Sequence, residues 1–447
     1  MRIKESFIVY RINKTKEKVN IFWFRRDLRL EDNAGLYHAL SDSLPVIPLF
    51  IFDTDILDEL DNKTDARVEF IHKAISEINN ELKKINTSLL VKIGNPSAVW
   101  KELINEFAVN EVYINHDYEP YAINRDNEIS KFVSSSGIKF NSYKDQVIFE
   151  KDEILNKSGS PYTVYTPYSK TWLEKLTKEN FKTYDTSKYF NNFYRDTSFR
   201  FSSLKETGFN ESGITFPGKK LRKEIIKNYQ NTRDYPFIDG TSKLSVHLRF
   251  GTVSIRKLIK EALKLNETWL KELIWREFFM QILYNFPHVV NESFRKEYDR
   301  IKWRNNEDEF DAWCKGTTGY PIVDAGMREL NQTGYMHNRV RMITASFLVK
   351  HLLIDWRWGE HYFADKLLDY DLSANNGNWQ WAAGTGCDAA PYFRVFNPTL
   401  QAAKFDKDNK YIRKWVPEFD KPEYPKPIVE HGFARKRAVE TYKKYLK

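Results

Sequence analysis

Residues 335–405 read YMHNRVRMITASFLVKHLLIDWRWGEHYFADKLLDYDLSANNGNWQWAAGTGCDAAPYFRVFNPTLQAAKF, and this is the most informative part of the chain. In helical surroundings it combines several arginines with paired carboxylates, consecutive amides and a Trp-x-Trp pair, namely Asp369, Asp371, Asn375, Asn376, Trp379 and Trp381. Buried polar groups at this density are costly unless each finds a partner. The stretch therefore predicts a helical region built around a bound cofactor or substrate.

The composition is that of a folded protein with a basic surface. The chain has 447 residues, 41% hydrophobic and 29% charged, enough for two or three domains. It contains no membrane-length apolar run, and residues 1–18 lack a signal-like hydrophobic block, so we expect a cytoplasmic protein. The two cysteines, Cys314 and Cys387, lack neighbours at metal-ligand spacing, so neither a disulfide nor a metal site is expected. The net charge of +9 favours a polyanionic partner, nucleic acid first.

The first third of the chain alternates apolar runs with helical patterns. The amphipathic segment 66–85 carries its apolar residues at helical spacing, and the runs that read as buried strands are 19–24, 44–52, 88–94, 111–115 and 138–143. This alternation predicts an α/β domain over 1–145 with a doubly wound parallel sheet, which would bind a ligand at the carboxyl ends of its strands. The first strand continues as RRDLRLEDN rather than G-x-G-x-x-G, so no dinucleotide clamp is expected here.

The rest of the chain divides into an irregular and a helical part. Between residues 146 and 210 periodicity fades, and Ser, Thr, Gly and aromatic residues become frequent. Irregular chain of this length usually marks a functional or inter-domain segment, so we predict a connector. Beyond it the patterns are almost wholly helical, which predicts a second, all-α domain over 211–447.

The motif GTSKLSVHL at 240–248 places two hydroxyls and a lysine at the start of an apolar helix. It is compatible with an ordinary helix N-cap or with a phosphate-binding site, because exposed helix N–H groups attract anions. Tyr229 and Arg233 lie just upstream and could cover or pair with the same ligand. The position of the motif within the whole set of candidate residues favours the phosphate site.

The helix pattern at 267–283 has an unusual face. A carboxylate and a guanidinium stand there among aromatic residues: Trp269, Glu272, Trp275, Arg276 and Phe279. One interpretation is a solvated ion pair between Glu272 and Arg276, and the other is a face that lines a pocket. The two tryptophans on the same stripe favour the pocket.

The helix pattern at 336–349 projects Asn338, Arg341 and Met342 to one side, which suits a polar-faced ligand with an apolar body. We expect His337 to be structural. Asp369 near Arg341 would form a buried pair that is costly unless a ligand shares its hydrogen bonds. Asn375 can both donate and accept, so it tolerates a ligand nitrogen whose protonation changes with redox state.

Taken together, these motifs resemble those of the photolyase/cryptochrome family over nearly the whole chain, and most closely the class I cyclobutane pyrimidine dimer photolyases. FWFRRDLRLEDN, the connector, GTSKLS, ELIWRE, GYPIVDAGMREL, NRVRM and ANNGNWQW occur in the family's order. The resemblance implies a doubly wound α/β domain joined to an all-α FAD-binding domain. It also implies a monomer without obligate protein partners that repairs ultraviolet-damaged DNA with light.

The resemblance implies a U-shaped FAD, active as the fully reduced anion. The positions that match the family's phosphate and ribityl contacts are Tyr229, Thr241, Ser242, Lys243, Leu244 and Ser245. Those around the adenine, diphosphate and isoalloxazine are Trp269, Arg276, Asn338, Arg341, Asp369 and Asp371. Asn375 matches the residue that faces flavin N5, where plant-type cryptochromes usually carry Asp and animal-type ones Cys, so the amide implies repair rather than signalling.

The resemblance also assigns substrate and electron-transfer positions. Residues matching those that touch the flipped pyrimidine pair are Glu272, Asn338 and Met342, and those that sandwich it are Trp275 and Trp381. Phosphate contacts, which set register without reading sequence, correspond to Arg233, Arg339, Arg394 and Lys404. A three-tryptophan relay from flavin to surface corresponds to Trp379, Trp356 and Trp303.

A second, antenna chromophore of folate or deazaflavin type is implied as well. The match is weakest here, since Tyr121 and Ala122 stand where folate-type relatives often show Asn-Glu. Three other functions remain open: a blue-light receptor without repair, a six-four photoproduct photolyase, and a non-catalytic basic DNA-binding protein. The pair Met336–His337 disfavours the six-four reaction, for which relatives typically carry two histidines.

Overall fold

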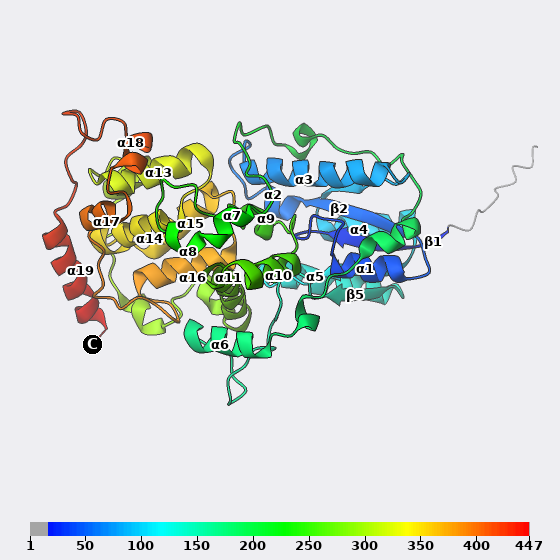
Figure 1. Ribbon diagram of the computed structural model, residues 1–447. Coiled ribbons are helices and arrows are strands. Elements are labelled where there is room, and N and C mark those ends of the chain that lie inside the picture. Colours follow the sequence, from blue (N-terminus) through cyan, green and yellow to red (C-terminus); the bar gives the residue numbers. More distant parts are fainter. Residues whose placement is uncertain (1–16, 447) are drawn as a thin grey trace, which may run out of the picture.

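The computed structural model of the protein describes residues 17–446. The predicted first domain, 1–145, and the expectation that residues 1–18 are no signal segment therefore lie partly outside the described residues. Figure 1 shows a sheet-containing half and a helical half side by side, with the C-terminal helix at the end far from the sheet. Within residues 17–446, no helix is long and apolar enough to cross a membrane.

Five parallel strands form one sheet in the order β3-β2-β1-β4-β5. The strands are β1 Lys18–Phe24, β2 Val46–Asp53, β3 Leu90–Gly94, β4 Ala108–Asn115 and β5 Lys139–Tyr143. The helices of this half are α1 Ala34–Ser41, α2 Thr54–Leu57, α3 Ala66–Lys83, α4 Pro96–Glu106 and α5 Pro120–Ser135.

Helices cover both faces of the sheet, which explains why β1 and β2 are apolar at nearly every position. Phe22 and Phe24 of β1 pack in one core with α1 and α3. The alternate residues Ile21 and Trp23 pack in a second core with α4 and α5. The prediction of a doubly wound parallel sheet is confirmed.

The connector is largely irregular and is held to the helical half by one buried carboxylate. It contains α6 Tyr165–Lys175 and the 3₁₀ helices η1 Lys178–Phe181, η2 Thr186–Asn192 and η3 Leu204–Thr207. Glu277 accepts hydrogen bonds from the backbone N–H groups of Ile148 and Phe149, at 2.7 and 2.9 Å, and from the indole of Trp172. The boundaries predicted at residues 145 and 210 stay predictions.

Among the described residues, every regular element beyond the connector is a helix, so the prediction of an all-α second half is confirmed. α11 is buried on most of its circumference and packs against α16, α10 and α6. The elements are α7 Lys223–Lys227, α8 Tyr229–Thr232, α9 Ser245–Arg249, α10 Ile255–Leu265, α11 Glu267–Asn285, η4 Pro287–Val290, η5 Lys296–Arg300, α12 Glu307–Lys315, α13 Pro321–Thr333, α14 Asn338–Ser346, the π-helix η6 Phe347–Leu352, α15 Trp356–Lys366, α16 Leu372–Ala383, α17 Pro398–Phe405, α18 Lys410–Trp415 and α19 His431–Tyr445.

A buried ion network joins the two halves, and the RRDLRLEDN segment after β1 supplies part of it. The Asp145 carboxylate pairs with two arginines: its Oδ2 lies 2.7 Å from Nη2 of Arg29, and its Oδ1 lies 2.7 Å from Nη2 of Arg256. Arg256 also binds Asp32 through Nε at 2.9 Å. These four residues, which we call the inter-domain network, are all buried. Because each charge has an opposite partner, the network offsets the cost of removing the charges from water.

Replacing one anion of the inter-domain network should destabilise the protein strongly. We expect Asp145→Asn to lower the free energy of unfolding by about 3 to 5 kcal/mol, because two buried guanidinium groups lose their shared carboxylate. Urea unfolding measures this change, and the exposed Asp152→Asn is the matched control. Equal stability of both variants would contradict the role of the network.

The Asp145 carboxylate should also make the stability of the protein sensitive to acid. Burial disfavours the charged form of Asp145, but Arg29 and Arg256 outweigh it and lower the pKa to about 2 from 3.8. The stability from this depressed pKa is fully present above 3.8 and is lost as the pH falls towards about 2. Across this window the wild type should lose about 2 kcal/mol more than Asp145→Asn. Parallel pH profiles in urea unfolding would contradict the assignment.

Candidate functional site

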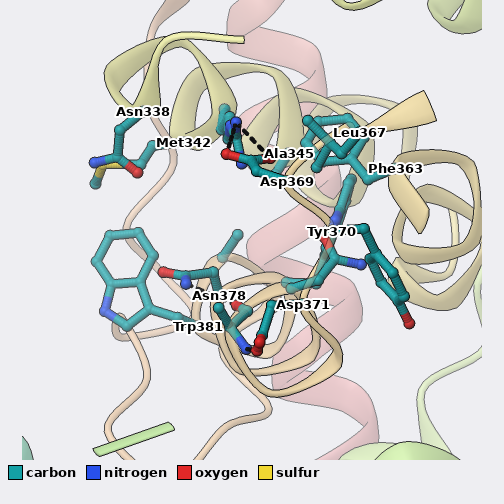
Figure 2. Close-up of a pocket in the computed structure, with 15 residues that line it drawn as sticks. Asn338, Met342, Ala345, Phe363, Leu367, Asp369, Tyr370, Asp371, Asn378 and Trp381 are labelled. Carbon is teal, nitrogen blue, oxygen red and sulfur yellow. Dashed lines mark hydrogen bonds and ion pairs between the residues drawn. The ribbon is translucent and has the colours of Figure 1, made fainter. Parts of the chain in front are cut away.

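Two pockets in the described part of the helical half share lining residues, and we treat them as the two lobes of one cavity. The larger lobe has a volume of about 430 Å³ and the smaller about 100 Å³. Both are lined by residues of α14, α16 and the segment between α15 and α16, namely Asn338, Arg341, Met342, Asp369, Asp371, Ala374, Asn378 and Trp381. Figure 2 shows the smaller lobe, with Asn338 and Met342 facing Asn378 and Trp381 across it. The larger lobe falls in the size range of cofactor sites.

One wall of the larger lobe is suited to an anionic group. Ser242 and Ser245 line it together with Arg276 of α11. The Arg276 guanidinium donates to the carbonyl oxygens of Gln146 at 2.7 Å and Leu248 at 3.3 Å. Within residues 17–446 it forms no ion pair with a carboxylate, and burial lowers its pKa. A partly buried cation that faces a cavity and has no ion-pair partner among the described residues fits the diphosphate of FAD.

The predicted phosphate motif contributes only in part. Ser242 and Ser245 line the larger lobe, as do Tyr229 and Trp269, whereas Thr241, Lys243 and Leu244 line neither lobe. Lys243 has a φ of +53° and turns its ammonium to Asp239 at 3.0 Å. Leu244 is buried in the core beside α11, and Thr241 offers its carbonyl oxygen to Arg222 at 3.3 Å. Lys243 and Leu244 therefore lie away from the cavity, between two serines that line it.

Asp369 and Arg341 form the predicted pair, with Nη2 2.9 Å from Oδ2. Asp371 instead caps α16, accepting from the N–H of Ala374 at 3.1 Å, and binds Arg26 at 2.5 Å. Burial raises the pKa of Asp371, but Arg26 and then Arg249 outweigh it and place the pKa far below its usual range.

The sequence did not identify Arg26 and Arg249 as site residues, although Arg249 lines the larger lobe. Arg26 belongs to the segment after β1, and no local pattern links it to α16. Arg249 stands in the helix that follows the predicted phosphate motif, where a polar residue is unremarkable. Their role follows only from the shared carboxylate of Asp371.

Asn375 lines the smaller lobe and is oriented by a second buried residue. Its Nδ2 donates to the carbonyl oxygen of Glu360 at 3.0 Å and to Oε1 of Glu360 at 2.8 Å. Both amide donors are therefore engaged, and the carbonyl oxygen remains for a ligand that donates a hydrogen bond. Burial raises the pKa of Glu360, an effect that Asn375 opposes. Sequence reasoning missed Glu360 because it lies on α15, a turn away from any recognised motif.

The predicted lesion-contacting residues line the same cavity. Glu272, Trp275, Asn338, Met342 and Trp381 all face the larger lobe, as the pocket interpretation of α11 predicted. Glu272 pairs with Arg233 rather than with Arg276. Burial raises the pKa of Glu272, and the charge of Arg233 opposes this.

The predicted relay tryptophans lie in or beside a hydrophobic cluster, whereas the predicted DNA-phosphate contacts differ in their partners. Trp379, which lines the smaller lobe, and Trp356 are 2% and 1% exposed, and Trp303 is half-buried at the edge of the same hydrophobic cluster. Of the predicted phosphate contacts, Arg233 and Arg339 pair with carboxylates. Arg394 and Lys404 lie over Phe396 and Phe405 instead, and neither has an ion pair within residues 17–446.

At the carboxyl edge of the sheet, where a ligand was expected, charged and aromatic side chains contact one another. Arg25 and Arg125 place their guanidinium groups 5.1 and 5.0 Å from the centre of the Trp23 ring. Tyr121 donates its hydroxyl to Asp53 at 2.8 Å. A second chromophore at this edge stays a prediction.

Comparison with known proteins agrees with this architecture. Residues 20–186 match the DNA photolyase family model, and residues 269–423 match the model of the FAD binding domain of DNA photolyase. The deoxyribodipyrimidine photo-lyase of Agrobacterium fabrum is 35% identical, over 94% of this chain and 97% of its own length. The enzyme of the same name from a Synechococcus species is 36% identical, over 94% and 96% of the two chains.

Solved structures share the fold over nearly the whole length of the chain. A bacterial class III photolyase from Agrobacterium tumefaciens has a TM-score of 0.87 at 34% identity and covers 98% of this chain and 99% of its own. An archaeal photolyase from Sulfolobus tokodaii, described with two FAD molecules, has a TM-score of 0.81 at 38% identity and covers 95% and 100%. A Synechocystis cryptochrome at 24% identity shares the fold alone, with a TM-score of 0.84 and coverage of 96% and 100%.

The fold and the cavity define a two-domain flavoprotein whose helical half binds FAD. The chain belongs to the DNA photolyase family. Its class within that family stays a prediction, since one structure with the same fold is described as class III.

Arg276 should be the residue on which FAD retention depends most. We expect Arg276→Gln to weaken FAD binding by about ten- to a hundredfold, because charge-assisted hydrogen bonds to a phosphate are lost in a buried site. The flavin absorbance per polypeptide and a fluorescence titration with FAD measure the effect. Arg435→Gln on the exposed face of α19 is the matched control. Full flavin content in the Arg276 variant would contradict the assignment.

Proposed function

We propose that the protein repairs cyclobutane pyrimidine dimers in ultraviolet-damaged DNA by light-driven electron transfer between bound FAD and a flipped-out dimer. The observation that carries this proposal is that candidate cofactor and lesion contacts line a single cavity. Asn375 and Trp379 lie in the smaller lobe, and Glu272 and Trp275 in the larger. A cofactor and a lesion bound there would share one cavity.

The cavity residues would bind and orient the two molecules. Bound FAD would supply the light absorption and the one-electron chemistry. Asn375, fixed by Glu360, would accept a hydrogen bond from the flavin, and Arg341 with Asp369 would bind its edge. Because these groups are already paired in the protein, they need little reorganisation when the cofactor binds.

On the substrate side, Trp275 and Trp381 would enclose the flipped pyrimidines. Tyr165 of the connector stacks on Trp275 with ring centres 3.6 Å apart and so covers one face of that indole. Glu272 would hydrogen-bond a base edge, and Asn338 and Met342 would complete the contact. A damaged pair stacks poorly in DNA and costs less to flip than an intact one, which supplies part of the selectivity.

Glu272 should be required for repair but not for FAD binding. We expect Glu272→Ala to lower the rate of repair by about tenfold at limiting DNA, because a charge-assisted hydrogen bond to the base is lost. The assay illuminates the reduced protein with dimer-containing oligothymidine and follows the recovery of thymine absorbance. Glu267→Ala, at the exposed start of the same helix, is the matched control. Full repair by the Glu272 variant would remove its assigned role.

The same assay separates the other functions. A blue-light receptor would bind FAD and leave the dimers intact, and a six-four photolyase would repair only six-four photoproducts. A protein that only binds DNA would purify without a flavin spectrum. Repair of cyclobutane dimers by the wild type is the result that the proposal requires.

Trp379, Trp356 and Trp303 would carry electrons from the surface to an oxidised flavin. We expect Trp356→Phe to slow light-driven flavin reduction by at least about tenfold, since phenylalanine is harder to oxidise than tryptophan. Flavin absorbance under blue light with an external thiol measures the rate. Trp358→Phe, two residues along the same helix and half-buried, is the matched control. Equal rates in both variants would argue against this route.

A further inference from the structure

Four alternating charges form a chain that begins at the wall of the larger lobe, where Glu272 and Arg233 lie. In spatial order they are Glu272, Arg233, Asp234 and Arg339, and we call them the charge chain. Nη2 of Arg339 lies 2.7 Å from Oδ1 of Asp234, and Nε of Arg233 lies 3.9 Å from the same oxygen. The chain links α11, the loop after α8 and the first turn of α14.

Asp234 is more exposed than the arginine with which it pairs most closely. Its side chain is 38% exposed, whereas that of Arg339 is 18% exposed. The guanidinium of Arg339 is also held by the Phe405 ring, 4.3 Å from its centre, and by the sulfur of Met342 at 3.7 Å. Arg339 is therefore oriented in advance, and Asp234 occupies its accessible anion-binding side.

The two other candidate phosphate contacts are not paired with a carboxylate in the described part of the chain. Arg394 and Lys404 rest on aromatic rings and have no carboxylate partner within residues 17–446. The carboxylate therefore accompanies only the arginines beside the cavity. A carboxylate and a phosphate offer the same kind of anionic oxygen to a guanidinium, so one can take the place of the other.

We propose that Asp234 occupies the place of a DNA phosphate on Arg339, and more weakly on Arg233, and so acts as an internal competitor for the DNA backbone. This inference rests on the proposed function, because it concerns how the same site binds DNA. A phosphate that reaches Arg339 must first displace Asp234. The free-energy cost of displacing Asp234 is the same for damaged and intact DNA. Asp234 therefore sets the affinity of the protein for DNA of any sequence. Contacts to the lesion add to that affinity.

The test compares Asp234→Asn with the wild type in the dark, so that no repair occurs. The probes are an undamaged duplex and the same duplex with one cyclobutane dimer, each followed by fluorescence anisotropy. We expect Asp234→Asn to bind both about two- to fivefold more tightly, the range expected for a partly exposed ion pair. The gain should shrink at high salt, where the pair in the wild type is already screened.

Two controls isolate the mechanism. Asp58→Asn, at the exposed end of α2, removes the same charge without releasing an arginine and should leave both affinities nearly unchanged. In an Arg339→Gln background, Asp234→Asn should lose most of its gain, because the competing partner is absent. Asp234→Ala, which also removes the carboxylate, should reproduce the gain if the asparagine variant unfolds early.

The outcomes separate this inference from the function on which it rests. Equal affinities of the wild type and both Asp234 variants would overturn the inference while leaving the proposed function intact. An equal gain in Asp58→Asn, or a full gain without Arg339, would also overturn it, because the effect would then be one of net charge. A wild type that binds neither duplex would instead overturn the proposed function itself.

Discussion

The ion pair between Arg26 and Asp371 is the contact on which the arrangement of the site depends. Arg26 follows the first strand of the sheet, and Asp371 caps the helix that carries Asn375, Trp379 and Trp381. The same guanidinium binds Asp117 at 3.1 Å and Glu119 at 2.8 Å beyond the end of β4. The start of α16 is therefore positioned by the α/β half, although α16 belongs to the helical half. The inter-domain network around Asp145 supports this join from a second side.

Charge balance explains how so many polar groups remain buried around the cavity. Asp371 and Asn375 are paired with Arg26 and Glu360, which line neither lobe, and Asp369 is paired with Arg341, which lines both. Arg276 is different, because its described hydrogen-bond partners are carbonyl oxygens. A partly buried cation in that state is stabilised by an anionic ligand, so FAD binding and the stability of the helical half should be linked.

Outside the cavity, a layer of supporting residues determines which groups of the site remain available. Glu360 engages the donors of Asn375, and Tyr165 covers one face of Trp275. Glu277 fastens the connector that carries Tyr165 onto α11, so the connector supports Trp275 from behind the cavity wall. The charge chain belongs to the same layer, because it pairs Arg233 and Arg339 with carboxylates.

The sequence by itself determined the elements and most of the residues that line the cavity. Apolar runs predict the strands, three- and four-residue spacing predicts α3, α11 and α14, and the Asp369–Arg341 pair follows from two motifs. Only the tertiary structure decided that Asp371 binds Arg26, that Glu272 binds Arg233 rather than Arg276, and that Lys243 turns away. Periodicity reports which face of an element is buried. Periodicity carries no information on which charged side chains pair between distant elements. Arg26 and Asp371, for example, are separated by 345 residues and are brought together only by domain packing.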